Sequence, residues 1–128
     1  MREAVKAIEE ARMRGVEVAA DVYPYTAGGT GLEAPIPSWA HEGGGNALFA
    51  RLRDPATRAR LKQEVATGSP GWWNIVEASG GWHNVVLVNA QNAGNAKFHG
   101  MNVAEIAKAL GKDPVDTAWD IEMRGNVP

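Results

Sequence analysis

The stretch from Glu3 to Tyr23 constrains the fold most, because two different periodicities follow one another within it. From Glu3 to Arg14, apolar side chains recur at helical spacing, and Gly15 is a natural left-handed end for that helix. From Val16 to Tyr23, apolar residues recur at every second position, which is typical of a strand. A helix followed directly by a strand normally belongs to a parallel sheet. The sequence therefore predicts a mixed α/β fold in which this unit is the second half of a repeat.

The predicted strand leads into a distinctive stretch, residues 21–32. Tyr23 and Tyr25 flank a proline that restricts the backbone, and the glycines that follow allow a sharp turn or a close approach to a ligand. Sites in α/β proteins usually lie at the carboxyl ends of strands. Two interpretations stay open: a binding site at a strand end, or a plain turn by which a strand leaves the core. These residues alone favour the plain turn.

A long connection rich in glycine and proline is expected over residues 26–46, and connections of that length are often lids or binding loops. Two helices should follow it. The second begins at Asp54 and Pro55, an N-cap followed by a proline at the first helical position, and ends at residues 68–71. The expected apolar face of the first helix is Leu48, Phe49 and Leu52. The side chains of the second helix that are expected to face solvent are Arg58, Arg60 and Lys62.

The last third of the chain is expected to hold two short strands and two helices. The strands are residues 74–76 and residues 85–88, the second buried on both faces. Asn102 should cap a helix together with Glu105, in the capping-box arrangement. The inward residues of that helix are Val103, Ile106, Ala107 and Leu110. After Gly111, a final helix should begin at Asp113 and Pro114, with Val115, Ala118 and Trp119 inward. It should end at residues 124–126, and residues 127–128 resemble the start of another strand.

Composition limits the classes of function. A chain of 128 residues with 45% hydrophobic and 22% charged residues is typical of a globular domain. A net charge near −2 gives no electrostatic reason to expect nucleic acid or a membrane surface as a partner. The absence of cysteine excludes disulfides, thiolate metal sites and a cysteine nucleophile within this sequence. The first ten residues resemble neither a signal peptide nor a membrane span, so a cytoplasmic protein is expected.

No motif by itself identifies an active site. The three histidines, His41, His83 and His99, are separated in sequence and show no spacing typical of a metal site. Asp21, at the end of the predicted strand, is a candidate general base, although a carboxylate that bonds a turn is more common there. No glycine-rich phosphate loop or nucleophile elbow is present. The five tryptophans are either an aromatic platform for a sugar or acyl group or, as we favour, bulky core residues.

Longer stretches carry a resemblance. Residues 20–32 read ADVYPYTAGGTGL, residues 37–44 read PSWAHEGG and residues 52–60 read LRDPATRAR. Further on, GW at 81–82, the run at 85–88, AEIA at 104–107, GKDPVD at 111–116 and GNV at 125–127 continue in the same order. In these stretches the chain resembles the N-acyl-D-amino-acid deacylases (D-aminoacylases) of the amidohydrolase superfamily. The resemblance implies an internal fragment of a metal-dependent (β/α)8 barrel, in which zinc activates water to attack an amide.

The resemblance also implies a division of the chain and a set of site residues. Residues 1–25 resemble a helix–strand unit of the barrel, residues 26–100 an inserted lid, and residues 101–128 helices that return to the barrel. Tyr23 matches a tyrosine that faces the substrate carboxylate. The family often has serine at the position of Gly29, where this chain offers only a backbone N–H, and Thr30 is a further hydroxyl donor. The family's zinc ligands and catalytic aspartate have no counterpart in this sequence, so we expect neither bound metal nor catalysis from it alone.

Three classes of function are therefore expected. As part of an enzyme, the chain would supply the substrate lid and one barrel wall of a deacylase, with the remainder of that enzyme as partner and an N-acyl-D-amino acid as ligand. As a free-standing module, it would bind a small ligand or a protein through its tryptophans and tyrosines. As an orphan segment, it would only self-associate, because an unpaired strand edge at residues 16–22 attracts another copy.

Overall fold

The computed structural model describes residues 2–125, and within them the protein is helical. The elements in chain order are α1 (Arg2–Met13), η1 (Ser38–His41), α2 (Gly44–Arg53), α3 (Pro55–Thr67), α4 (Ile75–Ala78), η2 (Trp82–Asn84), η3 (Ala93–Phe98), α5 (Val103–Leu110) and α6 (Pro114–Gly125). The described residues contain no sheet, and their one β contact is an isolated antiparallel bridge between Val86 and Asn102. The predicted α/β fold, a fragment of a (β/α)8 barrel, is therefore wrong.

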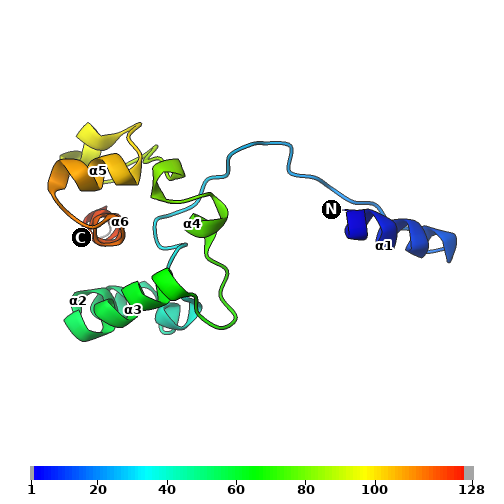
Figure 1. Ribbon diagram of the computed structural model, residues 1–128, viewed down its shortest axis with the longest axis horizontal. Coiled ribbons are helices and arrows are strands. Elements are labelled where there is room, and N and C mark those ends of the chain that lie inside the picture. The colour runs from blue at the N-terminus through cyan, green and yellow to red at the C-terminus, as the bar shows by residue number, and fades with distance from the viewer. Residues whose placement is uncertain (1, 126–128) are drawn as a thin grey trace.

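The N-terminal arm, which we define as residues 2–31, lies apart from the helical body (Figure 1). The helix predicted over residues 3–14 is confirmed as α1, but none of its described residues is buried. The strand predicted over residues 16–23 is wrong: this segment is extended and belongs to no ladder. A strand needs a second strand to bond its N–H and C=O groups, and the described part of the chain supplies none beside this segment.

The connection expected over residues 26–46 is shorter in the structure than the sequence predicts. The chain joins the body near Leu32, and Ile36 is fully buried ahead of η1. Helix α2 then begins at Gly44, directly after Gly43, whose positive φ of 85° is an angle that glycine adopts readily. The open part of the connection therefore ends near residue 31.

Helices α2 and α3 form as predicted. Leu48 and Leu52 are buried on the inner face of α2. The Asp54 carboxylate accepts a hydrogen bond from the N–H of Thr57 at 2.8 Å and so caps α3, which has Pro55 in its first turn. The basic side chains of α3 were expected to face solvent, and this is confirmed for Arg60, which is exposed. The expectation is wrong for Arg58 and Lys62, which face α6.

Neither strand predicted in the last third forms. The side chain of Asn74 accepts hydrogen bonds from Val76 and Glu77, and this N-cap starts the short helix α4 where a strand was expected. Residues 85–88 are extended, yet only Leu87 is buried, and the side chains of Val86 and Val88 are exposed. The expectation that this run is buried on both faces is therefore wrong.

The capping residues predicted for the two C-terminal helices are confirmed. Asn102 and Glu105 form the capping box at the start of α5, and Gly111 ends that helix with a left-handed φ of 63°. The Asp113 carboxylate accepts from the N–H groups of Val115 and Asp116 at the start of α6. Leu110, predicted to point inward, is 41% exposed. Residues 126–128, with the predicted strand start, lie outside the described residues.

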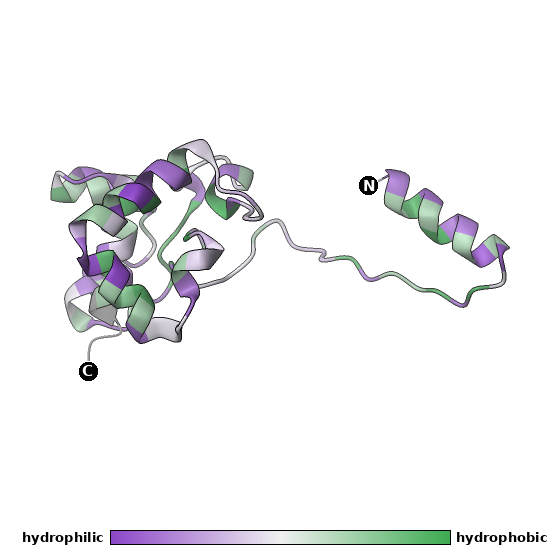
Figure 2. Cartoon of the chain, turned by 90° about the horizontal axis from the view of Figure 1, so that it is seen from below, coloured by the Kyte–Doolittle hydropathy of each residue, from purple (hydrophilic) through white to green (hydrophobic). Residues whose placement is uncertain are grey.

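Two apolar clusters hold the body together. The larger lies among α2, α3 and α6 and includes Leu52, Leu61 and the fully buried Trp119. The smaller joins Ile106 and Ile121 to Leu87 and Phe98. In Figure 2, hydrophobic and hydrophilic residues both occur along the separate α1. No helix in the described range is long and apolar enough to cross a membrane.

Candidate functional site

The residues that the resemblance implies for substrate binding all lie in the arm. Tyr23 is 66% exposed, and its hydroxyl donates to the backbone carbonyl of Ala27 at 3.2 Å. The rings of Tyr23 and Tyr25 meet edge to face, with their centroids 5.1 Å apart. Gly29 and Thr30 are exposed too, and a Cβ added at Gly29 would meet nothing within 4 Å. The structure thus places these residues on one open segment without enclosing them in a cavity.

The histidines and acidic residues do not converge. Nε2 of His41 lies 3.3 Å from the carbonyl oxygen of Ile36, Nε2 of His99 accepts from the N–H of Ala90 at 2.8 Å, and His83 is exposed. Within residues 2–125, no three histidine or acidic side chains lie close enough together to hold a metal ion. We therefore assign no zinc ligand among the described residues and derive no metal-dependent step from them.

The tryptophans mostly serve packing. Trp119 is fully buried, and its indole N–H has no hydrogen-bond partner among the described residues. Trp39 donates to a carboxylate oxygen of Glu64 at 2.7 Å and packs against the core, as do Trp72 and Trp82. These contacts support the core interpretation for these four. Trp73 is mostly exposed.

A shallow groove of about 390 Å³ lies where the C-terminal end of α3 meets α4, η2 and α6. Trp82, Val76 and Val115 supply part of its apolar wall. Lys62, Asn74 and Glu77 are among its polar residues, and Nδ2 of Asn74 donates to the carbonyl of Val65. Because the wall combines three separate stretches of sequence, no local motif could have indicated it.

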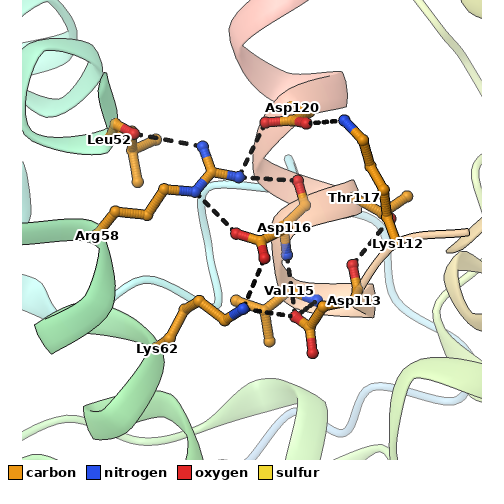
Figure 3. A network of polar contacts seen from close by, with 9 residues as sticks. All are labelled: Leu52, Arg58, Lys62, Lys112, Asp113, Val115, Asp116, Thr117 and Asp120. Atoms are coloured by element: carbon orange, nitrogen blue, oxygen red, sulfur yellow. Dashed lines mark hydrogen bonds and ion pairs between the residues drawn. The ribbon is translucent and has the colours of Figure 1, made fainter. Parts of the chain in front are cut away.

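The charged side chains gather between α3 and α6 (Figure 3). Arg58 bonds Asp116 through Nε and Asp120 through Nη2, both at 2.8 Å. Lys62 bonds Asp116, and Lys112 bonds Asp120, both at 2.6 Å. Each charge is paired, so this network offers no free group for catalysis. In the sequence, this network is indicated only by spacing. Arg58 and Lys62 lie four positions apart on α3, and Asp116 and Asp120 lie four positions apart on α6.

The pKa values within this network follow from its pairing. Burial acts to raise the pKa of Asp116, but the hydrogen bonds from Lys62 and Arg58 outweigh it and hold that pKa below its usual range. At Asp120, burial again acts to raise the pKa. The hydrogen bonds from Lys112 and Arg58 outweigh it, so this pKa is lowered too. The hydrogen bond to Asp116 raises the pKa of Lys62. All three pKa shifts favour the charged forms of Asp116, Asp120 and Lys62, whose ion pairs tie α3 to α6.

Comparison of the chain with known protein families, with curated proteins and with solved structures finds no significant match.

Proposed function

We propose that this chain acts as a substrate-contacting part of a zinc-dependent N-acyl-D-amino-acid deacylase. The observation that carries the proposal is the ordered series of sequence stretches from residue 20 to residue 127. The proposal concerns the activity and not the barrel fold. The open position of Tyr23 supports it, because an exposed phenol on an extended segment is accessible to a substrate held by other residues.

Amide hydrolysis at zinc requires metal ligands and a general base in addition to the residues that the structure describes. Bound zinc activates water for attack on an amide, and a catalytic site typically has three protein ligands and a general base around it. Since the described histidines and carboxylates form no such cluster, we assign this chain contact with the substrate only. Tyr23 would donate its hydroxyl to the substrate carboxylate, and the backbone N–H of Gly29 and the hydroxyl of Thr30 would add further donors.

Complementation tests this proposal. A D-aminoacylase from which the matching segment has been deleted is mixed with this chain, and hydrolysis of an N-acetyl-D-amino acid is measured with and without zinc. We expect no hydrolysis from either part alone and zinc-dependent hydrolysis from the mixture. Tyr23→Phe should raise KM in the mixture, whereas Tyr25→Phe, a second exposed tyrosine, should not. A soluble complex of the two parts without activity would refute the proposal.

The groove beside Trp82 favours a second candidate function, binding of a small sugar or acyl ligand. Its volume of about 390 Å³ lies within the usual range for small-molecule sites, and an indole wall suits either ligand. Titration with a panel of sugars and N-acyl amino acids should change tryptophan fluorescence, and Trp82→Phe should remove the change. Fluorescence that stays constant across the panel would exclude this function.

A further inference from the structure

The extended run at residues 85–88 has one bonded side and one open side. On the bonded side, the N–H of Leu87 donates to Met101 at 3.0 Å, its carbonyl accepts from Gly100 at 2.8 Å, and the N–H of Val103 donates to Val85 at 2.9 Å. Backbone groups alternate in direction along an extended chain, so those of Val86 point the opposite way. Neither Val86 nor Val88 forms a backbone hydrogen bond with another backbone group of the described chain. Residues 85–88 therefore form a strand edge without a neighbour.

This edge lacks the features by which proteins usually prevent strand addition. Proline, lysine and other charged residues normally block an exposed edge. Residues 84–90 contain no charged residue and no proline. The side chains beside the open backbone groups are those of Val86, 48% exposed, and Val88, 80% exposed. An added strand with its own apolar side would cover both valines.

The arm contains a segment of that kind. Residues 16–22 belong to no helix or ladder, and in their sequence Val16, Val18, Ala20 and Val22 alternate with Glu17, Ala19 and Asp21. Paired as a strand, this segment would place the first four side chains on one face. Over residues 17–31, no backbone N–H donates to a backbone carbonyl of the described chain. At its start the segment is bonded to α1, because the N–H of Val16 donates to the carbonyl of Ala11 at 3.0 Å and Nε of Arg12 donates to the carbonyl of Val18 at 3.0 Å. The rest of the segment and the edge at residues 85–88 both have open backbone groups, and Figure 1 shows the arm lying away from its own body.

We propose that residues 16–22 of one copy add as a strand to residues 85–88 of a second copy, and that two chains exchange their arms in this way. Reciprocal exchange gives a closed twofold dimer with two identical contacts. The contact between residues 16–22 and residues 85–88 would then occur twice in each dimer.

Charge favours this pairing over pairing of two arms with each other. An antiparallel pair of arms centred on Ala19 sets Glu17 opposite Asp21, and an in-register parallel pair sets each carboxylate opposite its own copy. Like charges directly opposite each other destabilise a strand pair. The uncharged edge at residues 85–88 imposes no such repulsion.

Disulfide formation between two differently tagged chains tests the contact directly, because the protein has no cysteine of its own. One chain carries Val86→Cys, and the other carries a single cysteine at one position from 16 to 22. Residues opposite each other in paired strands are close enough for a disulfide and point to the same face. We expect mixed disulfides with Val18→Cys or another even-numbered position, and few with Glu17→Cys, Ala19→Cys or Asp21→Cys. Absence of mixed disulfides, or equal yields at all positions, would overturn the proposal.

The dimer itself is measured by sedimentation equilibrium over a range of concentrations. Val86→Pro removes the outward N–H but leaves the three bonds of the inner side, and Val85 is already extended, as a residue before proline should be. We expect this variant to raise the dimer Kd about tenfold or more. Val88→Lys, which needs no backbone change, should also raise the dimer Kd. It replaces Val86→Pro as the test variant if Val86→Pro lowers the helical circular dichroism signal. Trp73→Lys, at an exposed aromatic outside residues 16–22 and 85–88, should leave Kd unchanged. A protein that is monomeric at every concentration, or edge variants with an unchanged Kd, would refute the exchange.

Discussion

The guanidinium group of Arg58 on α3 donates through Nε to the carboxylate of Asp116 on α6 at 2.8 Å, although the two residues lie 58 positions apart. The Arg58 side chain is only 18% exposed, and its guanidinium also lies 5.5 Å from the ring centre of Trp119. This contact joins the polar network to the larger apolar cluster.

Removing the Arg58 side chain should therefore destabilise the body. Arg58→Ala leaves Asp116 and Asp120 each without one partner, and we expect a loss of about 2 kcal/mol in the free energy of unfolding. Urea denaturation followed by circular dichroism measures it. Arg53→Ala, at an exposed arginine of α2, should change the free energy by less than about 0.5 kcal/mol. Equal effects of the two variants would contradict the stabilising role assigned to the network.

Stability should fall in acid because of the same network. The folded-state pKa values of Asp116 and Asp120 lie below the ordinary 3.8, so near that pH the unfolded chain binds more protons than the folded one. Their contribution is complete above the ordinary pKa and is lost as pH falls through the lower folded values. Urea midpoints measured from pH 6 down to about pH 2 should show this loss. In Asp116→Asn/Asp120→Asn the dependence should be weaker, and an unchanged slope would argue against the assignment.

The capping box of α5 should contribute measurably to stability. The side-chain oxygen of Asn102 accepts from the N–H of Glu105 at 2.9 Å, and the Glu105 carboxylate accepts in return from the N–H of Asn102 at 3.1 Å. Asn102→Ala removes the first bond and should cost about 1 kcal/mol, seen as a lower urea midpoint. Lys108→Ala, on the exposed side of the same helix, is the control and should have little effect.

The larger apolar cluster should respond strongly to truncation. Leu61 is fully buried on α3, and Leu61→Ala leaves a cavity that should cost about 3 kcal/mol. Leu110→Ala makes the same chemical change at a residue that is 41% exposed, where we expect a clearly smaller loss of about 1 kcal/mol. Comparison of the two denaturation curves separates burial from helix propensity, and similar losses would contradict the placement of Leu61 in the core.

The surroundings of the candidate site residues could not be predicted from the sequence. The sequence around Tyr23, Gly29 and Thr30 does not show that they lie on an open arm, because their exposure depends on which distant residues they contact. The groove beside Trp82 and the network around Arg58 both combine residues from distant stretches. Periodicity reports which side of an element is apolar, but it does not report which other element that side meets.

The sequence by itself determined the ends of most helices. The Asp54 cap, the Asn102 capping box and the stop at Gly111 each involve groups within about one helical turn, so local chemistry was sufficient. Tertiary structure alone decided whether the two runs predicted as strands, residues 16–23 and 85–88, pair with other backbone. The first run alternates in sequence and the second is continuously apolar, but a strand exists only when distant backbone bonds its N–H and C=O groups. One run finds no such partner in the described chain, and the other finds it on one side only.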